Sequence, residues 1–183
     1  MLEQIGVRFE LLLADTDEDA ESLEMAEPHE APMRYVKRVT QLKLEAALHR
    51  LKRRGLPAAP VLCADTTVAL GRVIYGKPVD AKDAHRMLAE LARKTHRVLT
   101  AVAVGTAARQ VLQVSESKVT FGALGATEIR AYVASGEPMG KAGAYAVQGK
   151  AAGFIEKIAG SYTGIMGLPL FETAHLLRTF RIL

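Results

Sequence analysis

Three charged side chains stand where packing alone would place apolar ones, and such conflicts between pattern and burial mark candidate functional sites. Asp65 interrupts the nearly continuous apolar run Val61–Leu70. Lys43 falls on the apolar face of a predicted helix, four residues after Val39. The third charge, Lys77, follows a predicted turn and a short returning strand. A carboxylate within a buried strand costs several kcal/mol unless it is paired, bound to a metal or open to a cleft.

Together these residues form the set that phosphoryl cleavage requires. A carboxylate can hold magnesium or accept a proton from the attacking water, and lysines neutralise phosphate oxygens as point charges. We therefore predict Asp65 as the catalytic base or a metal ligand, and Lys43 and Lys77 as phosphate contacts. A structural ion pair between Asp65 and one of the two lysines is the alternative.

An acidic loop lies upstream of the predicted helix that carries Lys43. Its six carboxylates are Asp15, Asp17, Glu18, Asp19, Glu21 and Glu24. We predict Glu18 as a second metal or water ligand. The alternative is a solvated loop, because dense runs of acidic residues are usually exposed to water.

Other chemical motifs are missing from the sequence. It contains no phosphate-binding loop of the Gly-x-x-x-x-Gly-Lys-Ser/Thr type, no dinucleotide fingerprint, no paired cysteines and no His-Glu-x-x-His. The five histidines lack ligand spacing, and we assign them surface or capping roles. Cys63 is the only cysteine and lies in an apolar run, so we interpret it as a structural thiol.

Charge and hydropathy narrow the classes of partner. A formal charge of +4 and a pI near 9.3 favour anions, either nucleic acid or a phosphorylated small molecule. The densest basic cluster (Arg50, Lys52, Arg53 and Arg54) ends a predicted helix without interleaved aromatics. We interpret it as a solvated helix end and rank nucleic-acid binding last. The apolar runs are too short to cross a bilayer and no signal pattern opens the chain, so we expect a cytoplasmic protein without a membrane partner.

The first half of the chain predicts the elements that position these residues, within a single domain covering residues 1–183. Residues 7–14 form an apolar run that favours a strand. A helix of about 20 residues should begin between Pro28 and Pro32. Val61–Leu70 indicates a strand covered on both faces, and residues 73–75 a short returning strand.

The second half adds helices and an antiparallel strand pair. We expect a helix over residues 81–92 with Asp80 as its N-cap, then paired strands at 96–106 and 111–121. Thr127 is predicted to cap a further helix that ends at Gly136. The small residues from Lys141 to Gly149 permit a close backbone approach to a ligand or another strand. A strand at 154–158 and a helix at 168–180 complete the chain.

A series of short motifs, in this order, resembles the Maf (septum formation) family of nucleoside triphosphate pyrophosphatases. The resemblance covers nearly the whole chain and rests on residues 2–7, 35–43, 64–66, 76–78, 132–138, 141–145, 148–149, 160–162 and 167–170. The segment from Lys141 to Gly149, with Tyr145 and Gln148, is similar to the dTTP/UTP branch rather than the 7-methyl-GTP branch. Gly140 stands where many members carry aspartate, so we assign it no catalytic role.

The resemblance implies an α/β fold with a mixed, elongated sheet, flanking helices and a central cleft between two lobes, similar to inosine triphosphatase. It also implies a homodimer that cleaves the bond between the α and β phosphates with a divalent cation, Mg²⁺ or alternatively Mn²⁺. Asp65 matches the general base, and Thr66 and Gln148 match positions linked to substrate choice. We likewise expect Tyr145, in the segment similar to the dTTP/UTP branch, to contact the substrate. Glu18, Lys43 and Lys77 match charged residues of the family's cleft.

One departure concerns the beginning of the chain. The family opens with a strand and a Ser-x-Ser-Pro-Arg-Arg segment, and this sequence starts within the helix that follows, so we expect an N-terminally truncated Maf-like domain. A start codon placed too late is our preferred explanation. A catalytically impaired nucleotide-binding or cell-division regulatory homologue is the alternative, because lysines cannot replace the bidentate phosphate contacts of arginine. Comparing this chain with an in-frame upstream extension would separate the two.

Overall fold

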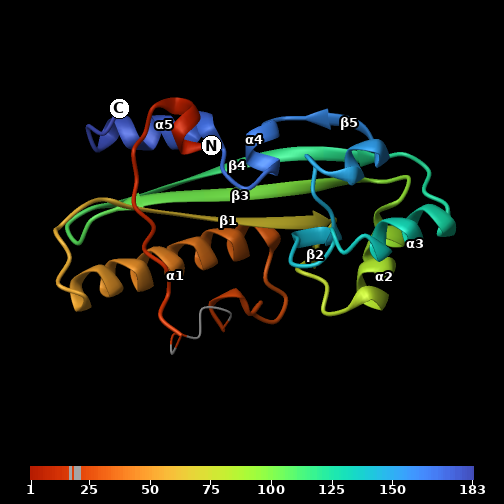
Figure 1. The fold of residues 1–183 in the computed structure, drawn as a ribbon, viewed down its shortest axis with the longest axis horizontal. Coiled ribbons are helices and arrows are strands. Elements are labelled where there is room, and N and C mark those ends of the chain that lie inside the picture. The colour runs from red at the N-terminus through yellow and green to blue at the C-terminus, as the bar shows by residue number, and fades with distance from the viewer. Residues whose placement is uncertain (17, 19–21) are drawn as a thin grey trace.

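A five-stranded antiparallel sheet runs the length of the molecule (Figure 1). The computed structural model describes residues 1–16, 18 and 22–183. The strand order is β2-β1-β3-β4-β5, and neighbouring strands in this order are antiparallel. The strands are β1 (Val61–Leu70), β2 (Val73–Tyr75), β3 (Thr95–Gly105), β4 (Gln110–Phe121) and β5 (Ile155–Ala159).

The outer edge of β1 is only partly covered. On one side β1 pairs with β3 from Val61↔Gly105 to Ala69↔Arg97. On the other side β2 pairs only from Val68 to Leu70. Along residues 61–67, this edge therefore has no strand partner among the described residues, and side chains from both faces of β1 can border the same space.

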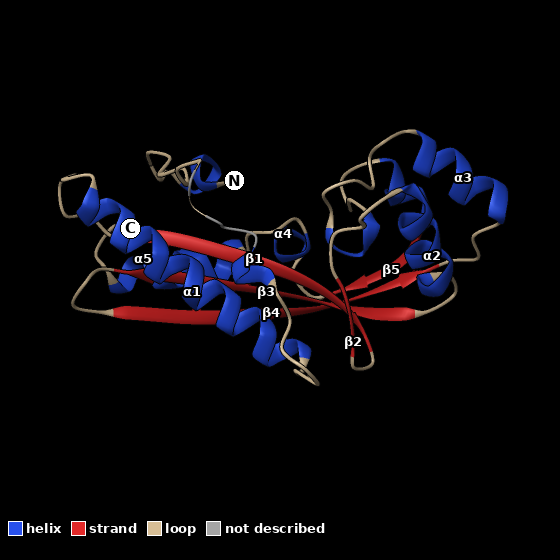
Figure 2. Cartoon of the chain, turned by 90° about the horizontal axis from the view of Figure 1, so that it is seen from below, coloured by secondary structure: helices blue, strands red, loops and turns tan. Residues whose placement is uncertain are grey.

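Helices cover the two ends of the sheet separately (Figures 1 and 2). At one end α1 (Pro32–Arg53) packs on β1 and β3, while α5 (Leu170–Thr179) and η1 (Leu2–Ile5) lie across the opposite face. At the other end α2 (Ala81–Leu91) packs against α3 (Ala126–Ala134). The remaining short helices are η2 (Ser22–Glu24), η3 (Ala142–Ala144), η4 (Lys150–Phe154) and α4 (Tyr162–Ile165).

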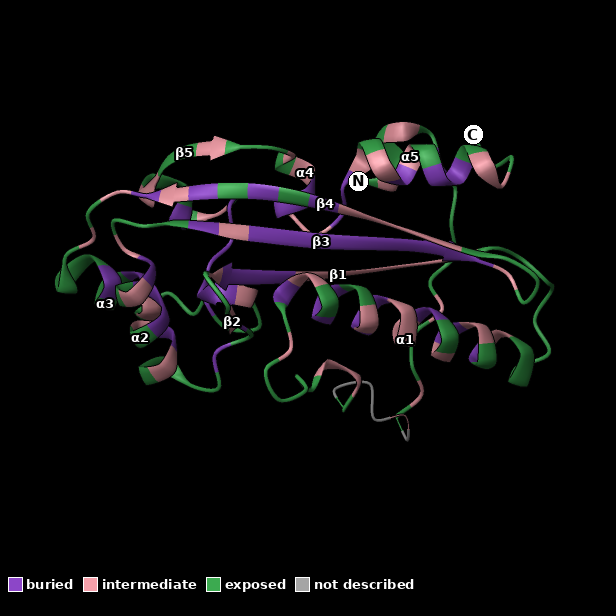
Figure 3. Ribbon diagram, turned by 180° about the vertical axis from the view of Figure 1, so that it is seen from behind, coloured by how far each residue is buried: buried purple, intermediate pink, exposed green. Residues whose placement is uncertain are grey.

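Each end of the sheet has its own apolar core, and β3 is buried along nearly its whole length (Figure 3). The α2 end is packed around Leu88, Leu91 and Phe121. At the α5 end, Val102, Val104 and Leu176 form the centre. Val36 of α1 packs with Leu99 and Ala101 on the face that α5 does not cover. One cluster thus lies at the α2 end of the sheet, and the other two lie on opposite faces of the α5 end. This division into two ends agrees with the predicted two lobes.

The α/β class with an elongated sheet and flanking helices is confirmed. The helix beginning at Pro32 and the β3–β4 pair also agree with the prediction. Asp80 caps α2 as predicted, since its Oδ1 accepts a hydrogen bond from the Asp83 N–H at 2.7 Å. Every described helix is too short or too polar to cross a lipid bilayer.

Two local predictions were wrong. Residues 7–14 form no strand, because no neighbouring strand pairs with them, and Arg50 and Arg54 hydrogen-bond the Leu12 and Leu13 carbonyls instead. Thr127 does not cap α3. The N-cap is Gly125, whose N–H donates to the Glu128 carboxylate at 2.7 Å.

Candidate active site

A cavity of about 270 Å³ opens at the middle of β1, where the strand edge is free. It lies between α1 on one side and α4 with the 140–148 segment on the other. Its lining residues are Glu24, Lys43, Ala64, Asp65, Thr66, Val68, Lys77, Val98, Gly140, Lys141, Ala142, Tyr145, Ala146, Val147, Gln148, Ile165, Met166 and Gly167. Six of the seven residues predicted for the site are among them, the exception being Glu18.

Alternating charges form a chain along one wall of the cavity. Lys43 Nζ donates to Asp65 Oδ1 at 2.6 Å and to Glu24 Oε1 at 2.7 Å. Lys77 Nζ donates to Glu24 Oε2 at 2.7 Å. The Tyr35 hydroxyl donates to the Glu24 backbone carbonyl at 2.7 Å and fixes this part of the segment on α1. The predicted ion pair of Asp65 is therefore present, and it lies inside a cavity.

The two carboxylates of this chain differ in acidity. Burial raises the pKa of Asp65, and its bond to Lys43 only partly offsets the effect, because the Asp65 side chain is only 10% exposed. Burial also raises the pKa of Glu24. The hydrogen bonds from Lys43 and Lys77 lower it by more, so the pKa of Glu24 lies below its ordinary value. Burial thus favours a proton on Asp65, whereas the two lysines favour the anionic form of Glu24.

Hydroxyl groups organise the opposite face of β1. Thr66 and Thr100 are paired in the sheet, and their Oγ1 atoms are 2.9 Å apart. Thr100 Oγ1 also donates to the Gly164 carbonyl at 2.6 Å, which ties α4 to the sheet. Gly167 closes this corner with φ 111°, and a Cβ there would lie 3.7 Å from Thr66 Oγ1. Thr66 is therefore held at the cavity by its neighbours.

The segment from Lys141 to Gly149 forms the third wall. Gly143, with φ 70°, lies so close to β1 that a Cβ would be 2.8 Å from Val68 Cγ1. This approach confirms the prediction that the small residues of the segment allow close backbone contact. Tyr145 is buried and Gln148 is exposed at the cavity. Lys141 adds an exposed cation at the rim.

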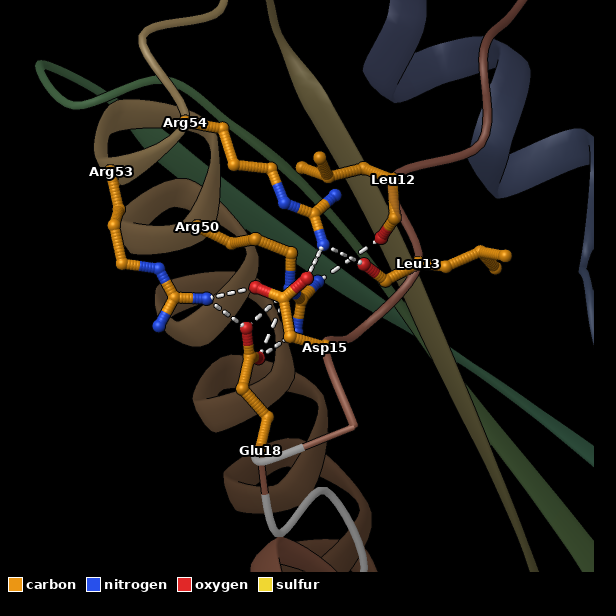
Figure 4. Close-up of polar contacts among 7 residues, drawn as sticks. All are labelled: Leu12, Leu13, Asp15, Glu18, Arg50, Arg53 and Arg54. Carbon is orange, nitrogen blue, oxygen red and sulfur yellow. Dashed lines mark hydrogen bonds and ion pairs between the residues drawn. The ribbon is translucent and has the colours of Figure 1, made fainter.

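Glu18 lies apart from the cavity, beside the end of α1 (Figure 4). Its carboxylate accepts from Arg50 Nε at 3.0 Å and from Arg53 Nη2 at 2.6 Å. These partners, Arg50 foremost, lower the pKa of Glu18 to about 2. Asp15 pairs with Arg53 and Arg54 in the same cluster. The structure thus does not bring Glu18 to Asp65.

Two further interpretations require correction. The basic end of α1 is not merely solvated, because Arg50, Arg53 and Arg54 bind the carboxylates and carbonyls of the acidic segment (Figure 4). His96 is neither a surface nor a capping residue. It is 1% exposed, and its ring packs edge-on against Phe121.

The sequence interpretation overlooked Glu24 and Lys141. Both belong to segments that it singled out, the acidic loop and the small-residue motif, but neither stands out by residue type. Among the described residues no group of three or more His, Cys, Asp or Glu side chains gathers as a metal site. Asp65 and Glu24 come closest, since both reach one ammonium group. Magnesium commonly uses one or two carboxylates and completes its shell with water and substrate phosphates, so this pair fits such a cation.

The fold and the charged cavity together indicate the class of protein to which this chain belongs. A family model described as Maf-like protein matches residues 1–180, and the chain belongs to this family.

Particular relatives are similar over nearly the whole chain. The dTTP/UTP pyrophosphatase of Albidiferax ferrireducens is 68% identical over 180 residues, which are 98% of this chain and 90% of that protein. The dTTP/UTP pyrophosphatase of Polaromonas sp. is 61% identical over 178 residues, covering 97% of this chain and 88% of the relative. The dTTP/UTP pyrophosphatase of Cupriavidus metallidurans is 62% identical over 178 residues, which are 97% of this chain and 89% of that protein. The predicted branch agrees with these names.

Proposed function

We propose that this chain is a nucleoside triphosphate pyrophosphatase that hydrolyses dTTP and UTP to the nucleoside monophosphate and pyrophosphate. The observation that carries the proposal is a cavity in which a buried carboxylate of raised pKa, Asp65, is surrounded by Lys43, Lys77 and Lys141. The names of the close relatives support the choice of substrate. A binding-only role would not require a buried base beside the phosphate-binding cations, so we do not favour the regulatory alternative.

Asp65 acts as the general base of this reaction. Its carboxylate takes one proton from a water molecule, and the water oxygen forms a bond to the α phosphorus. The bond between this phosphorus and the bridging oxygen breaks, and its electron pair leaves with pyrophosphate. A base is most effective when its pKa lies near the working pH, and burial shifts Asp65 in that direction. Lys43, held at 2.6 Å, keeps the carboxylate oriented.

The remaining residues bind the substrate. Lys77 and Lys141 contact phosphate oxygens, and Lys43 takes part when Glu24 yields its hydrogen bond. Thr66, Tyr145 and Gln148 form the walls that receive the nucleoside, and they line the cavity beside the apolar side chains of Val68 and Val98.

A divalent cation, Mg²⁺ or alternatively Mn²⁺, completes the proposed site. Asp65 and Glu24 would hold it, and when bound it would neutralise phosphate oxygens. Glu18 remains a predicted ligand, although its bonds to Arg50 and Arg53 make it the weaker candidate. Equilibrium dialysis with Mn²⁺ and the non-hydrolysable analogue α,β-imido-dUTP tests this assignment, because Glu24→Gln should weaken metal binding more than Glu18→Gln does.

The proposal also covers the cellular location, the oligomeric state and the partners of the enzyme. We infer a cytoplasmic homodimer without nucleic-acid or membrane partners, following the family resemblance. Pairing of Arg50, Arg53 and Arg54 with acidic residues supports the exclusion of nucleic acid, since it leaves fewer free cations for phosphate backbones. Light scattering on the purified chain tests the dimer, and titration with duplex DNA at low salt tests the exclusion.

Product analysis tests the proposed reaction. The chain is incubated with Mg²⁺ and with dTTP, UTP, 7-methyl-GTP or ATP in turn, and the products are separated by ion-exchange chromatography. We expect monophosphate and pyrophosphate in equal amounts from dTTP and UTP, with slower turnover of the purine nucleotides. Release of orthophosphate and a diphosphate would instead indicate cleavage between the β and γ phosphates and would overturn the proposal.

A further inference from the structure

Tyr145 forms part of the cavity wall, and one side chain determines where its hydroxyl lies. The residue follows η3 and is only 6% exposed. Its ring meets Phe121 edge-on at 4.9 Å between centroids and His96 at 5.4 Å. Among the described residues, the hydroxyl forms one hydrogen bond, to His96 Nε2 at 2.9 Å.

His96 is an unusual choice for its position if packing is the only requirement. It lies near the start of β3, opposite Val119, in the core of the α2 lobe. Its second nitrogen, Nδ1, is buried without a hydrogen-bond partner among the described residues. An imidazole with only one of its two nitrogens hydrogen-bonded is less favourable in a core than an apolar ring of similar size. Within the described part of the chain, the one side-chain hydrogen bond of His96 is directed at a residue of the cavity.

The rest of the cavity indicates which part of a nucleotide this wall meets. Lys43 and Lys77 form one chain of ion pairs with Asp65 and Glu24, and Lys141 adds a further cation at the rim. Tyr145 lies in the part lined by Val68, Val98 and Ile165, where apolar side chains prevail. A triphosphate requires the cations, so the apolar part is left for the nucleoside.

We propose that His96 is a positioning residue for nucleoside binding, which fixes the ring of Tyr145 through the bond between Nε2 and the tyrosine hydroxyl. His96 itself lies behind the wall and touches no substrate. The inference rests on the proposed function for the identity of the ligand, but its geometry does not depend on any reaction step. Loss of the bond lets the Tyr145 ring tilt, and the nucleoside loses a preorganised surface.

Nucleotide affinity tests this role independently of catalysis. Isothermal titration with α,β-imido-dUTP and Mg²⁺ measures Kd for the wild type, His96→Phe, Tyr145→Phe and the double variant. We expect each single substitution to weaken binding roughly tenfold. The double variant should be no weaker than either single one, because both remove the same bond.

Two matched variants separate positioning from a general loss of packing. His96→Gln places an amide where Nε2 lies, and it should restore Kd to within about threefold of wild type. Tyr75→Phe removes the hydroxyl of another buried tyrosine, which donates to Glu90 at 2.8 Å and does not line the cavity, so it should leave Kd unchanged. In turnover of UTP, His96→Phe should raise KM more than it lowers kcat.

The outcomes distinguish this inference from the proposed function. Unchanged Kd in His96→Phe, or equal weakening by Tyr75→Phe, would overturn the positioning role while leaving the pyrophosphatase untouched. Conversely, a wild type that binds the analogue but cleaves no nucleotide would refute the proposed function, and tighter binding by wild type than by His96→Phe would still support the positioning role. If the wild type does not bind the analogue, both proposals fail.

Discussion

Burial of His96 should make the stability of this chain depend on pH below neutrality. Burial lowers the pKa of His96 from its ordinary 6.5 to about 4. Below pH 6.5 the unfolded chain binds a proton at this residue, while the folded chain does not until about pH 4, so protons favour the unfolded state between these values. His96 therefore destabilises the fold progressively as the pH falls, by about 2 kcal/mol between pH 7 and pH 5.

Urea unfolding followed by circular dichroism at pH 7 and pH 5 measures this effect. The free energy of unfolding of the wild type should fall by about 2 kcal/mol more than that of His96→Phe, whatever the two stabilities at pH 7. Effects of other titrating groups, including Asp65, cancel in this difference when they are the same in both proteins. Thr127→Ala, at an exposed position of α3, is the control and should keep the wild-type dependence. Equal losses in wild type and His96→Phe would refute the reasoning.

Three further substitutions probe the cavity walls. Lys43→Met should lower the free energy of unfolding at pH 7 by about 1–3 kcal/mol, because the substitution leaves the buried Asp65 carboxylate without its partner. Urea unfolding measures this loss, and unchanged stability would contradict the pairing. Lys141→Ala should raise KM for UTP roughly tenfold with little change in kcat, whereas Lys157→Ala on β5 should change neither. Gly143→Ala should cost about 1–3 kcal/mol, since a Cβ would lie 2.8 Å from Val68 at a positive φ. Gly153→Ala, which has open space, is its control, and equal melting temperatures for the two would rule out the close approach.

Apolar periodicity was sufficient to predict most of the fold. The stripe of Val36 and Val39 specifies the inward face of α1, and both side chains are fully buried. Lys43 follows on the same face and Asp65 interrupts the neighbouring strand, so packing of α1 on β1 brings the two charges together. The conflict between charge and burial therefore located the cavity from the sequence.

The partner of each acidic residue could not be predicted, because it depends on the path of the segment across α1. Lys43 and Arg50 are seven residues apart and present two cations on similar sides of the helix. The segment passes Arg50 first and Lys43 later, so Glu18 binds the former and Glu24 the latter. Composition alone does not distinguish these two glutamates.

His96 and the cap of α3 escaped prediction for related reasons. A lone histidine carries no periodic signal, and its burial follows from the long-range approach of Phe121 and Tyr145. At α3, the sequence offers Thr127 as a capping side chain, but Glu128 reaches back to the Gly125 N–H and starts the helix earlier.

The role of Asp65 as general base is the central claim, and the turnover number of Asp65→Asn with UTP tests it most directly. The substitution keeps the size of the side chain and removes its proton-accepting charge, so kcat should fall by about 10²–10⁴-fold. Glu156→Gln, at an exposed carboxylate of β5, should retain wild-type kcat. A kcat for Asp65→Asn within about threefold of wild type, in a folded protein that still binds α,β-imido-dUTP, would contradict the account.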